Sequence, residues 1–293
     1  MSLFEICPND SCQLYKNVFE AETEMMVAAK KLCIELWEIY EPFADEHFIQ
    51  EIRSDFSARF WEMDLACFFL KQSRSMTCPK PGPDIKIGDR IWIEAISPTQ
   101  GANDNPNRVP DIVMGEAHQV KGELIELRYT AAIVEKFNKY RSYLRKGIIK
   151  DDEPYIIALN SSQIPHAELD DRIPRIAKSL LAIGREYVTL DRETHKHIGS
   201  GHHHQQSIRK QSGSEVATDT FLDPNYAGIS AVLYSNSDLV NRAGKDGQGF
   251  LLVHNPLAKN PVGEGFLRTG SEIVPTIKSE TEYSLKFESH ESA

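Results

Sequence analysis

The stretch of residues 82–96 constrains the fold more than any other part of this sequence. Two short runs of β-forming residues, 85–87 and 90–96, flank a Gly-Asp pair. Apolar runs on either side of a turn-forming pair with glycine predict a tight β-hairpin. This hairpin places one acid, Asp84, where the first strand begins and a second, Glu94, inside the second strand.

Glu94 is surrounded in the sequence by apolar residues. Its neighbours are Ile91, Trp92, Ile93, Ala95 and Ile96. A carboxylate in such a run is costly to bury unless a partner compensates for its charge. Strand alternation puts Trp92 on the same face as Glu94, so a solvent-facing Glu94 would expose a tryptophan. Two acids that face each other across a hairpin can share a divalent metal through hard oxygen ligands.

Asp84 is less informative when taken alone, because an aspartate after proline is equally typical of a turn or a cap. A second Pro-Asp pair at Pro110 and Asp111 shows that the dipeptide is not specific. The spacing of the hairpin and its flanking helices therefore carry the interpretation.

The helix predicted before the hairpin covers about residues 55–71, with Asp55 as its N-cap. Helical spacing puts Glu62 on a stripe with Ala58, Ala66 and Phe69, where an acid is unusual. A salt-bridged acid at the surface is the competing interpretation of Glu62.

The helix predicted after the hairpin covers about residues 124–145 and ends at Gly147. Lys136 stands beside its apolar stripe, and Lys139 lies one turn away and more to the side. A lysine stem can pack along such a face and direct its ammonium at a polar centre. The competing interpretation of Lys136 is an ordinary solvated lysine.

The remaining chain alternates between helical, strand-like and polar segments. We expect helix over 14–50 with a break at Pro42, a long polar loop over 97–122, a strand over 154–160, a short helix over 173–183, an exposed loop or protruding hairpin over 190–215, strands over 228–235 and 249–254, and a polar tail from 276. Long loops in compact domains are often functional. Adjacent histidines at 202–204 would face opposite ways on a strand, which makes a dedicated metal site there a poor prediction.

The order of helix with Glu62, Pro-Asp with Asp84, strand with Glu94, then helix and strand resembles the PD-(D/E)XK restriction-endonuclease-like superfamily. The resemblance covers roughly residues 55–160. The family usually has a lysine two residues after the strand acid, where this chain has Ile96. In some branches the following helix supplies that lysine, and Lys136 is then the first candidate.

Lys139 is the second candidate for that role, and Gln100 is a third polar substitute. The resemblance implies an α/β fold with a restriction-endonuclease-like core, a central mixed β-sheet flanked by helices, and extra N-terminal helices. The corresponding segments are 1–54 as an N-terminal helical segment, 55–275 as the α/β domain and 276–293 as the polar tail. The N-terminal helices would cover one face or support a homodimer.

The resemblance also implies a reaction, the hydrolysis of DNA phosphodiester bonds with Mg²⁺ or Mn²⁺. Asp84, Glu94 and the carbonyl of Ala95 would hold the metal, with Glu62 binding directly or through water. Lys136 would orient the attacking water or stabilise the developing charge. A catalytically inactive protein of this fold that binds nucleic acid or a protein partner is the alternative, and a metal-dependent hydrolase of small molecules is a third.

Composition limits these alternatives without deciding between them. The chain has 293 residues and a formal net charge of −10, which argues against broad nonspecific adhesion to nucleic acid but not against a local basic patch. Five cysteines without a CxxC pair favour a reducing compartment and no structural zinc. With neither a signal-peptide pattern nor a membrane-length apolar run, we expect a cytoplasmic protein that does not enter a membrane.

Overall fold

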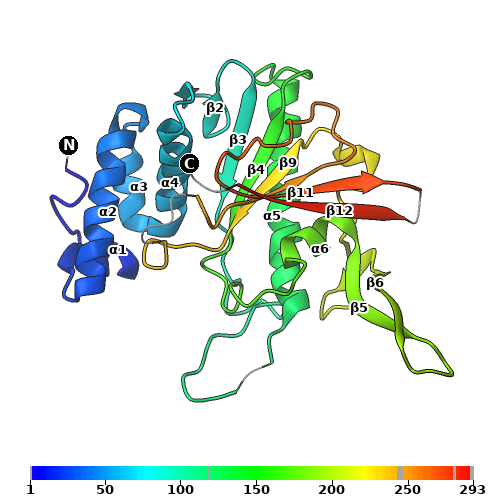
Figure 1. Ribbon diagram of the computed structural model, residues 1–293. Helices are drawn as coiled ribbons and strands as arrows, with labels where there is room; N and C mark the ends of the chain where they lie inside the picture. The colour runs from blue at the N-terminus through cyan, green and yellow to red at the C-terminus, as the bar shows by residue number, and fades with distance from the viewer. Residues whose placement is uncertain (1, 118, 243–246, 280–281, 291–293) are drawn as a thin grey trace.

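The computed structural model describes residues 2–117, 119–242, 247–279 and 282–290. Within these residues, eight strands form one central mixed sheet in the order β1-β2-β3-β4-β9-β10-β11-β12, with helices on both of its faces (Figure 1). The prediction of an α/β fold with a central mixed sheet flanked by helices is therefore confirmed.

The sheet combines two parallel groups of strands with antiparallel pairs between them and at both edges. The strands β3, β4 and β9 run parallel to one another, as do β10 and β11, while the other neighbouring pairs are antiparallel. The bounds are β1 Met76–Thr77, β2 Ile85–Ile87, β3 Ile91–Ile96, β4 Tyr155–Asn160, β9 Ala231–Ser235, β10 Leu251–His254, β11 Gly270–Ile277 and β12 Tyr283–His290.

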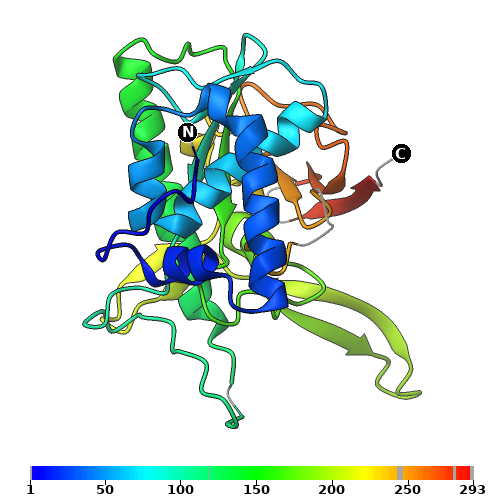
Figure 2. The ribbon, with the colours of Figure 1, turned by 90° about the vertical axis from the view of Figure 1, so that its left-hand side faces the viewer.

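One face of the sheet is covered by the N-terminal helices, which form a layer in front of it in Figure 2. These are α1 Gln13–Glu20, α2 Glu24–Tyr40, the 3-10 turn η1 Glu41–Phe43, α3 Phe48–Ser54 and α4 Phe56–Lys71. Aromatic side chains of α2, α3 and α4 share one buried cluster with Ile93 and Ile156 of the sheet. The segment 1–54 thus packs directly on the sheet-bearing part of the chain.

The break predicted at Pro42 in the helical region 14–50 is confirmed, because α2 ends at Tyr40 and the turn η1 follows, but the region also breaks once earlier. Helix α1 ends at Ala21, which adopts a left-handed conformation with φ 48°, and α2 restarts at a new N-cap, Thr23. The side chain of Thr23 accepts a hydrogen bond from the main-chain N–H of Met26, which satisfies one free donor of the new helix.

The predicted helix over 55–71 is confirmed as α4, which lies between the sheet and α2. Asp55 is its N-cap, and its side chain accepts a hydrogen bond from the main-chain N–H of Ala58. Trp61 donates from Nε1 to the main-chain oxygen of Ala158 on β4 at 3.0 Å. This buried bond fixes α4 on the sheet one residue before Glu62.

The predicted hairpin over 82–96 is confirmed as β2 and β3. Gly88 adopts a positive φ of 56° in its turn, a conformation that glycine reaches without steric cost. Ile85 pairs with Ile93 and Ile87 with Ile91. The same register continued by one residue puts Asp84 directly opposite Glu94.

The opposite face of the sheet is covered by α5 Gly122–Arg145 and α6 Arg175–Leu181, which pack in a second buried cluster with Trp92 and Tyr155. The described part of the segment 97–121 contains no helix or strand, in agreement with the predicted loop.

The polar region predicted as an exposed loop or protruding hairpin contains a two-stranded ribbon, β5 Ile183–Leu190 paired with β6 His197–His204. The ribbon and the loop before α5 both project from the same end of the molecule in both ribbon views (Figures 1 and 2). A second small pair, β7 Ser207–Arg209 and β8 Glu215–Ala217, follows, and the 3-10 turn η2 covers Pro224–Tyr226.

The segment predicted as a polar tail contributes to the sheet in its described part. Strand β12 pairs with β11 over eight residues, from Tyr283 opposite Ile277 to His290 opposite Gly270. Alternating polar and apolar residues along β12 are typical of an edge strand with one face exposed. Among the described residues, no helix is long and apolar enough to span a bilayer.

Candidate functional site

The predicted pair of acids meets at the end of the β2–β3 hairpin. Asp84 is half-buried, whereas the side chain of Glu94 is completely buried. Asp84 accepts a hydrogen bond from the main-chain N–H of Ala95 at 2.7 Å, just beyond the last paired residues of β2. Like charges directly opposite each other on a sheet are destabilising, so this pair needs compensating cations.

Two lysines of α5 provide this compensation. Lys136 Nζ lies 3.0 Å from Oε1 of Glu94, and Lys139 Nζ lies 2.6 Å from the same oxygen. Tyr143 adds a longer hydrogen bond of 3.4 Å to Oε2 and donates to the carbonyl of Gly82 at 3.0 Å. Lys136 is only 12% exposed, and Lys139 is 45% exposed.

Burial raises the pKa of Glu94 above its ordinary value of 4.5, and the charge of Asp84 raises it further. Lys136 and Lys139 oppose this shift without overcoming it. Burial lowers the pKa of Lys139, but the charge and hydrogen bond of Glu94 outweigh that effect and raise it. Lys139 is thus held as an ammonium group against a carboxylate whose charge is costly.

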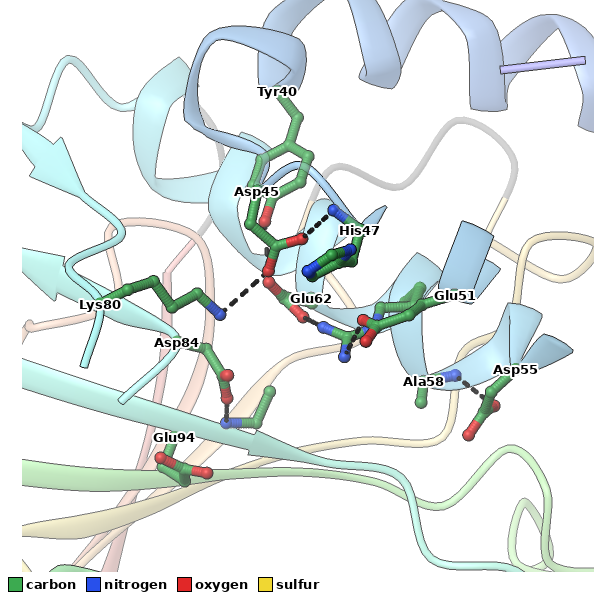
Figure 3. A network of polar contacts seen from close by, with 12 residues as sticks. Tyr40, Asp45, His47, Glu51, Asp55, Ala58, Glu62, Lys80, Asp84 and Glu94 are labelled. Atoms are coloured by element: carbon green, nitrogen blue, oxygen red, sulfur yellow. Dashed lines mark hydrogen bonds and ion pairs between the residues drawn. The ribbon is translucent and has the colours of Figure 1, made fainter. Parts of the chain in front are cut away.

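Glu62 approaches Asp84 from the opposite side, out of α4. Figure 3 shows Asp84 between Glu62 and Glu94. Tyr40 donates a hydrogen bond to Oε1 of Glu62 at 2.8 Å, and Arg59 donates to Oε2. Burial and then the charge of Asp84 raise the pKa of Glu62, while Arg59 lowers it.

A cation also lies on the outer side of this group. Lys80 forms an ion pair of 3.1 Å with Asp45, as Figure 3 shows, and its charge acts on both Glu62 and Asp84. The acids therefore lie in a mixed field of positive and negative charge rather than in an isolated acidic patch.

The site opens into a cleft of about 610 Å³ between α4 and α5, at the carboxyl end of β3. Asp84 and Glu62 line this cleft, as do Lys136, Lys139 and Arg128. Arg128 donates a hydrogen bond of 2.7 Å from Nε to the carbonyl of Thr99, which holds its side chain beside the start of the long loop. Side chains from four separate segments therefore surround one space.

The donors at the cleft and beside it suit a hard divalent cation. Asp84 lines the cleft, Glu94 is buried next to it, and both offer the carboxylate oxygens that Mg²⁺ and Mn²⁺ favour. The N–H of Ala95 points at Asp84, and since both main-chain polar groups of a strand residue point to the same neighbour, its carbonyl points to that side too. A cation held by Oε1 of Glu94 would have to displace Lys136 or Lys139 from that oxygen.

The three predicted acids do not form a preassembled ligand cluster. Among the described residues, the one group of three or more acid, histidine or cysteine ligand atoms within 4.8 Å of one another is Glu272, Glu288 and His290. The structure thus brings Glu62, Asp84, Glu94 and Lys136 to one place, with Lys139 beside them. Gln100 does not line the cleft, and its side chain lies instead at Asp111 in the loop.

Sequence reasoning did not identify three further residues of the site: Arg59, Tyr40 and Tyr143. Arg59 follows Asp55 by one helical turn and precedes Glu62 by three residues, a spacing that could have revealed the ion pair. Tyr143, on the buried side of α5, bonds to Glu94. The histidines at 203 and 204 are exposed on β6.

Comparisons with models of protein families, with curated proteins and with solved structures find no match for this chain.

Proposed function

We propose that this protein is a metal-dependent nuclease that hydrolyses DNA phosphodiester bonds, built on a core of the PD-(D/E)XK restriction-endonuclease-like type. One observation carries the proposal. Asp84 and Glu94 face each other at a strand end, two lysines from the next helix converge on Glu94, and Glu62 enters from the preceding helix. This is the arrangement that the resemblance in the sequence implies.

Each residue has a distinct role in the proposed mechanism. Asp84, Glu94 and the carbonyl of Ala95 would hold Mg²⁺ or Mn²⁺, with Glu62 assisting directly or through water. A metal held there would supply a Lewis acid for a phosphate oxygen and an activated water.

Ile96 occupies the position where the family usually has a lysine, and Lys136 serves in place of that lysine. Its ammonium is preoriented by Glu94 and lines the cleft, where it orients the water or stabilises charge on the phosphate. Lys139, on the same oxygen, keeps Glu94 from being left uncompensated while Lys136 acts. Arg128, one further cation of the cleft, is placed to contact a phosphate on the same side.

The test is cleavage of plasmid and single-stranded DNA with Mg²⁺ or Mn²⁺. Asp84→Ala and Glu94→Gln should each reduce the rate by roughly 100-fold or more, on the scale of losing one group that stabilises the transition state. Asp111→Asn, which alters the second Pro-Asp pair in the exposed loop, should cleave at the unaltered rate. Equal activity in all variants would refute the proposal.

The alternative is a catalytically inactive protein of this fold that binds nucleic acid or a protein partner. It is favoured by Ile96 and by the engagement of both lysines with Glu94. DNA binding without cleavage under any divalent ion, together with the absence of Mn²⁺ binding that depends on Asp84, would support it. Hydrolysis of a small phosphodiester with no activity on DNA would instead favour the third alternative, a metal-dependent hydrolase of small molecules.

A further inference from the structure

A second group of side chains that can bind a metal lies toward the opposite edge of the sheet from the β2–β3 hairpin, on β10, β11 and β12. Glu272 of β11 stands directly opposite Glu288 of β12, and His290 follows Glu288 by two residues. Because side chains alternate along a strand, these three lie on one face. His254 of β10 reaches the same face and contacts Glu272 at 2.8 Å.

Glu272 is completely buried and held in one orientation. Its Oε2 accepts from the main-chain N–H of Gly265 at 3.0 Å and contacts His254, and its Oε1 accepts from the N–H of Leu267 at 2.6 Å. A carboxylate has about four lone-pair positions, so these three contacts leave one lone-pair position available on Oε1. That oxygen faces His290.

His290 supplies an independent observation. Its Nε2 is shut off from solvent and has no hydrogen-bond partner among the described residues, although the ring as a whole is 26% exposed. Nε2 lies 3.8 Å from Oε1 of Glu272. A direct hydrogen bond between them would be about 2.7–2.9 Å long.

The separation of these atoms suits two ligands of one ion better than a direct bond. Ligand atoms about 2.0–2.2 Å from a tetrahedral zinc ion lie roughly 3.3–3.6 Å from each other. Ligand atoms of Glu272, Glu288 and His290 all lie within 4.8 Å of one another. A small adjustment of the edge strand would place all three around a single cation.

We propose that Glu272, Glu288 and His290 bind a d-block divalent cation such as Zn²⁺. An imidazole nitrogen beside two carboxylates favours zinc over Mg²⁺, which prefers oxygen ligands alone. The hydrogen bonds from Gly265, Leu267 and His254 are the outer contacts that orient a metal-binding carboxylate. Lys286 already forms an ion pair of 2.6 Å with Glu288, and the ion adds to this compensation of the two opposed acids and ties β12 to the buried Glu272.

This site is independent of the cleft, since β4, β9 and β10 separate β11 from β3 in the sheet. Its role is structural, because binding to the folded chain alone stabilises that chain. The failure of either proposal therefore leaves the other untouched.

The experiment titrates the chelator-treated full chain with ZnCl₂ by calorimetry and records the melting temperature with and without zinc. We expect the unaltered chain to bind one equivalent of zinc. In His290→Ala and in Glu288→Gln, this binding should be at least about tenfold weaker or lost. The same variants should lose the rise in melting temperature on addition of zinc.

Two control variants separate this site from others in the chain. His204→Ala removes an exposed histidine of β6, and Asp111→Asn removes an exposed carboxylate of the long loop; both should retain the equivalent. A circular dichroism spectrum of each variant checks its fold, and Glu288→Gln makes the test independent of His290→Ala. Unchanged zinc affinity and stoichiometry in both ligand variants, or no zinc binding by the unaltered chain, would overturn the proposal.

Discussion

Glu94 and Glu272 are two glutamates of one sheet, each completely buried, and yet the protein treats their charges in opposite ways. Burial and the neighbouring Asp84 raise the pKa of Glu94 despite two lysines. Burial also raises the pKa of Glu272, but the hydrogen bonds of His254, Leu267 and Gly265 outweigh it and bring the pKa below 4.5.

The difference teaches that burial alone does not set the charge state of a carboxylate. Main-chain N–H groups are fixed donors that carry no formal charge. They therefore stabilise the charged form of Glu272 without the cost of removing a second charged group from water. The lysines at Glu94 must themselves be removed partly from water. Strongly perturbed pKa values are common at functional sites, so the raised pKa of Glu94 is in keeping with the proposed function, whereas the hydrogen-bonded Glu272 is in keeping with a structural role.

The largest expected effect separates the two lysines of Glu94. Lys136→Met should reduce DNA cleavage by roughly 100-fold, because this ammonium is only 12% exposed and is therefore little screened by solvent. Lys139→Met should reduce it less than about tenfold, because the half-exposed Lys139 is screened by solvent.

Cleavage rates at saturating DNA measure this difference, with Lys146→Met at the exposed end of α5 as the control. A greater loss in Lys139→Met than in Lys136→Met would transfer the proposed role to Lys139.

The next prediction compares how much each of the two buried glutamates contributes to the free energy of unfolding. Glu272→Gln should lower the free energy of unfolding by about 3 kcal/mol, because it weakens three buried contacts at once. Glu94→Gln should cost less than about 1 kcal/mol, since it also removes the repulsion by Asp84.

Urea denaturation of both variants in the presence of a chelator measures these values without bound metal. Equal losses would mean that the two carboxylates have the same structural role.

A third carboxylate, Glu126 of α5, tests the effect of burial away from both sites. Burial raises its pKa to about 7, although Lys178 and Arg175 oppose the shift. The folded chain then binds a proton between pH 4.5 and about 7 that the unfolded chain has released. Stability should therefore increase by roughly 1–3 kcal/mol as the pH falls across this range.

Glu126→Gln should remove this part of the pH dependence, which urea denaturation at several pH values would show. The control is Glu135→Gln, an exposed carboxylate of the same helix. An identical pH profile in the unaltered chain and Glu126→Gln would argue against burial as the cause.

The smallest expected effect concerns the support of the cleft. Asp55→Ala should cost about 1 kcal/mol of stability through loss of the N-cap of α4, the helix that carries Glu62. Asp55→Asn should retain most of it, because asparagine caps equally well. Thermal melting of the two variants measures the difference, and equal melting temperatures would show that the cap contributes nothing.

The sequence predicted the parts of this protein that depend on near neighbours. The hairpin followed from a Gly-Asp turn between apolar runs, α4 from its Asp55 cap and apolar spacing, and the strand β4 from a continuous apolar run. Each of these patterns is local, because turn geometry, capping and side-chain periodicity act over a few residues. The same reasoning missed the early end of α1 at Ala21.

Only the tertiary structure decided which side chains meet. Glu94 contacts lysines 42 and 45 residues away, and Glu272 contacts His254 across two parallel strands. Lys136 and Lys139 were both candidates in the sequence, and the structure places both on one oxygen. The sequence by itself determined the hairpin, α4, β4 and the identity of the acids. The packing of distant segments decided their partners, because burial and charge depend on every segment that packs around them.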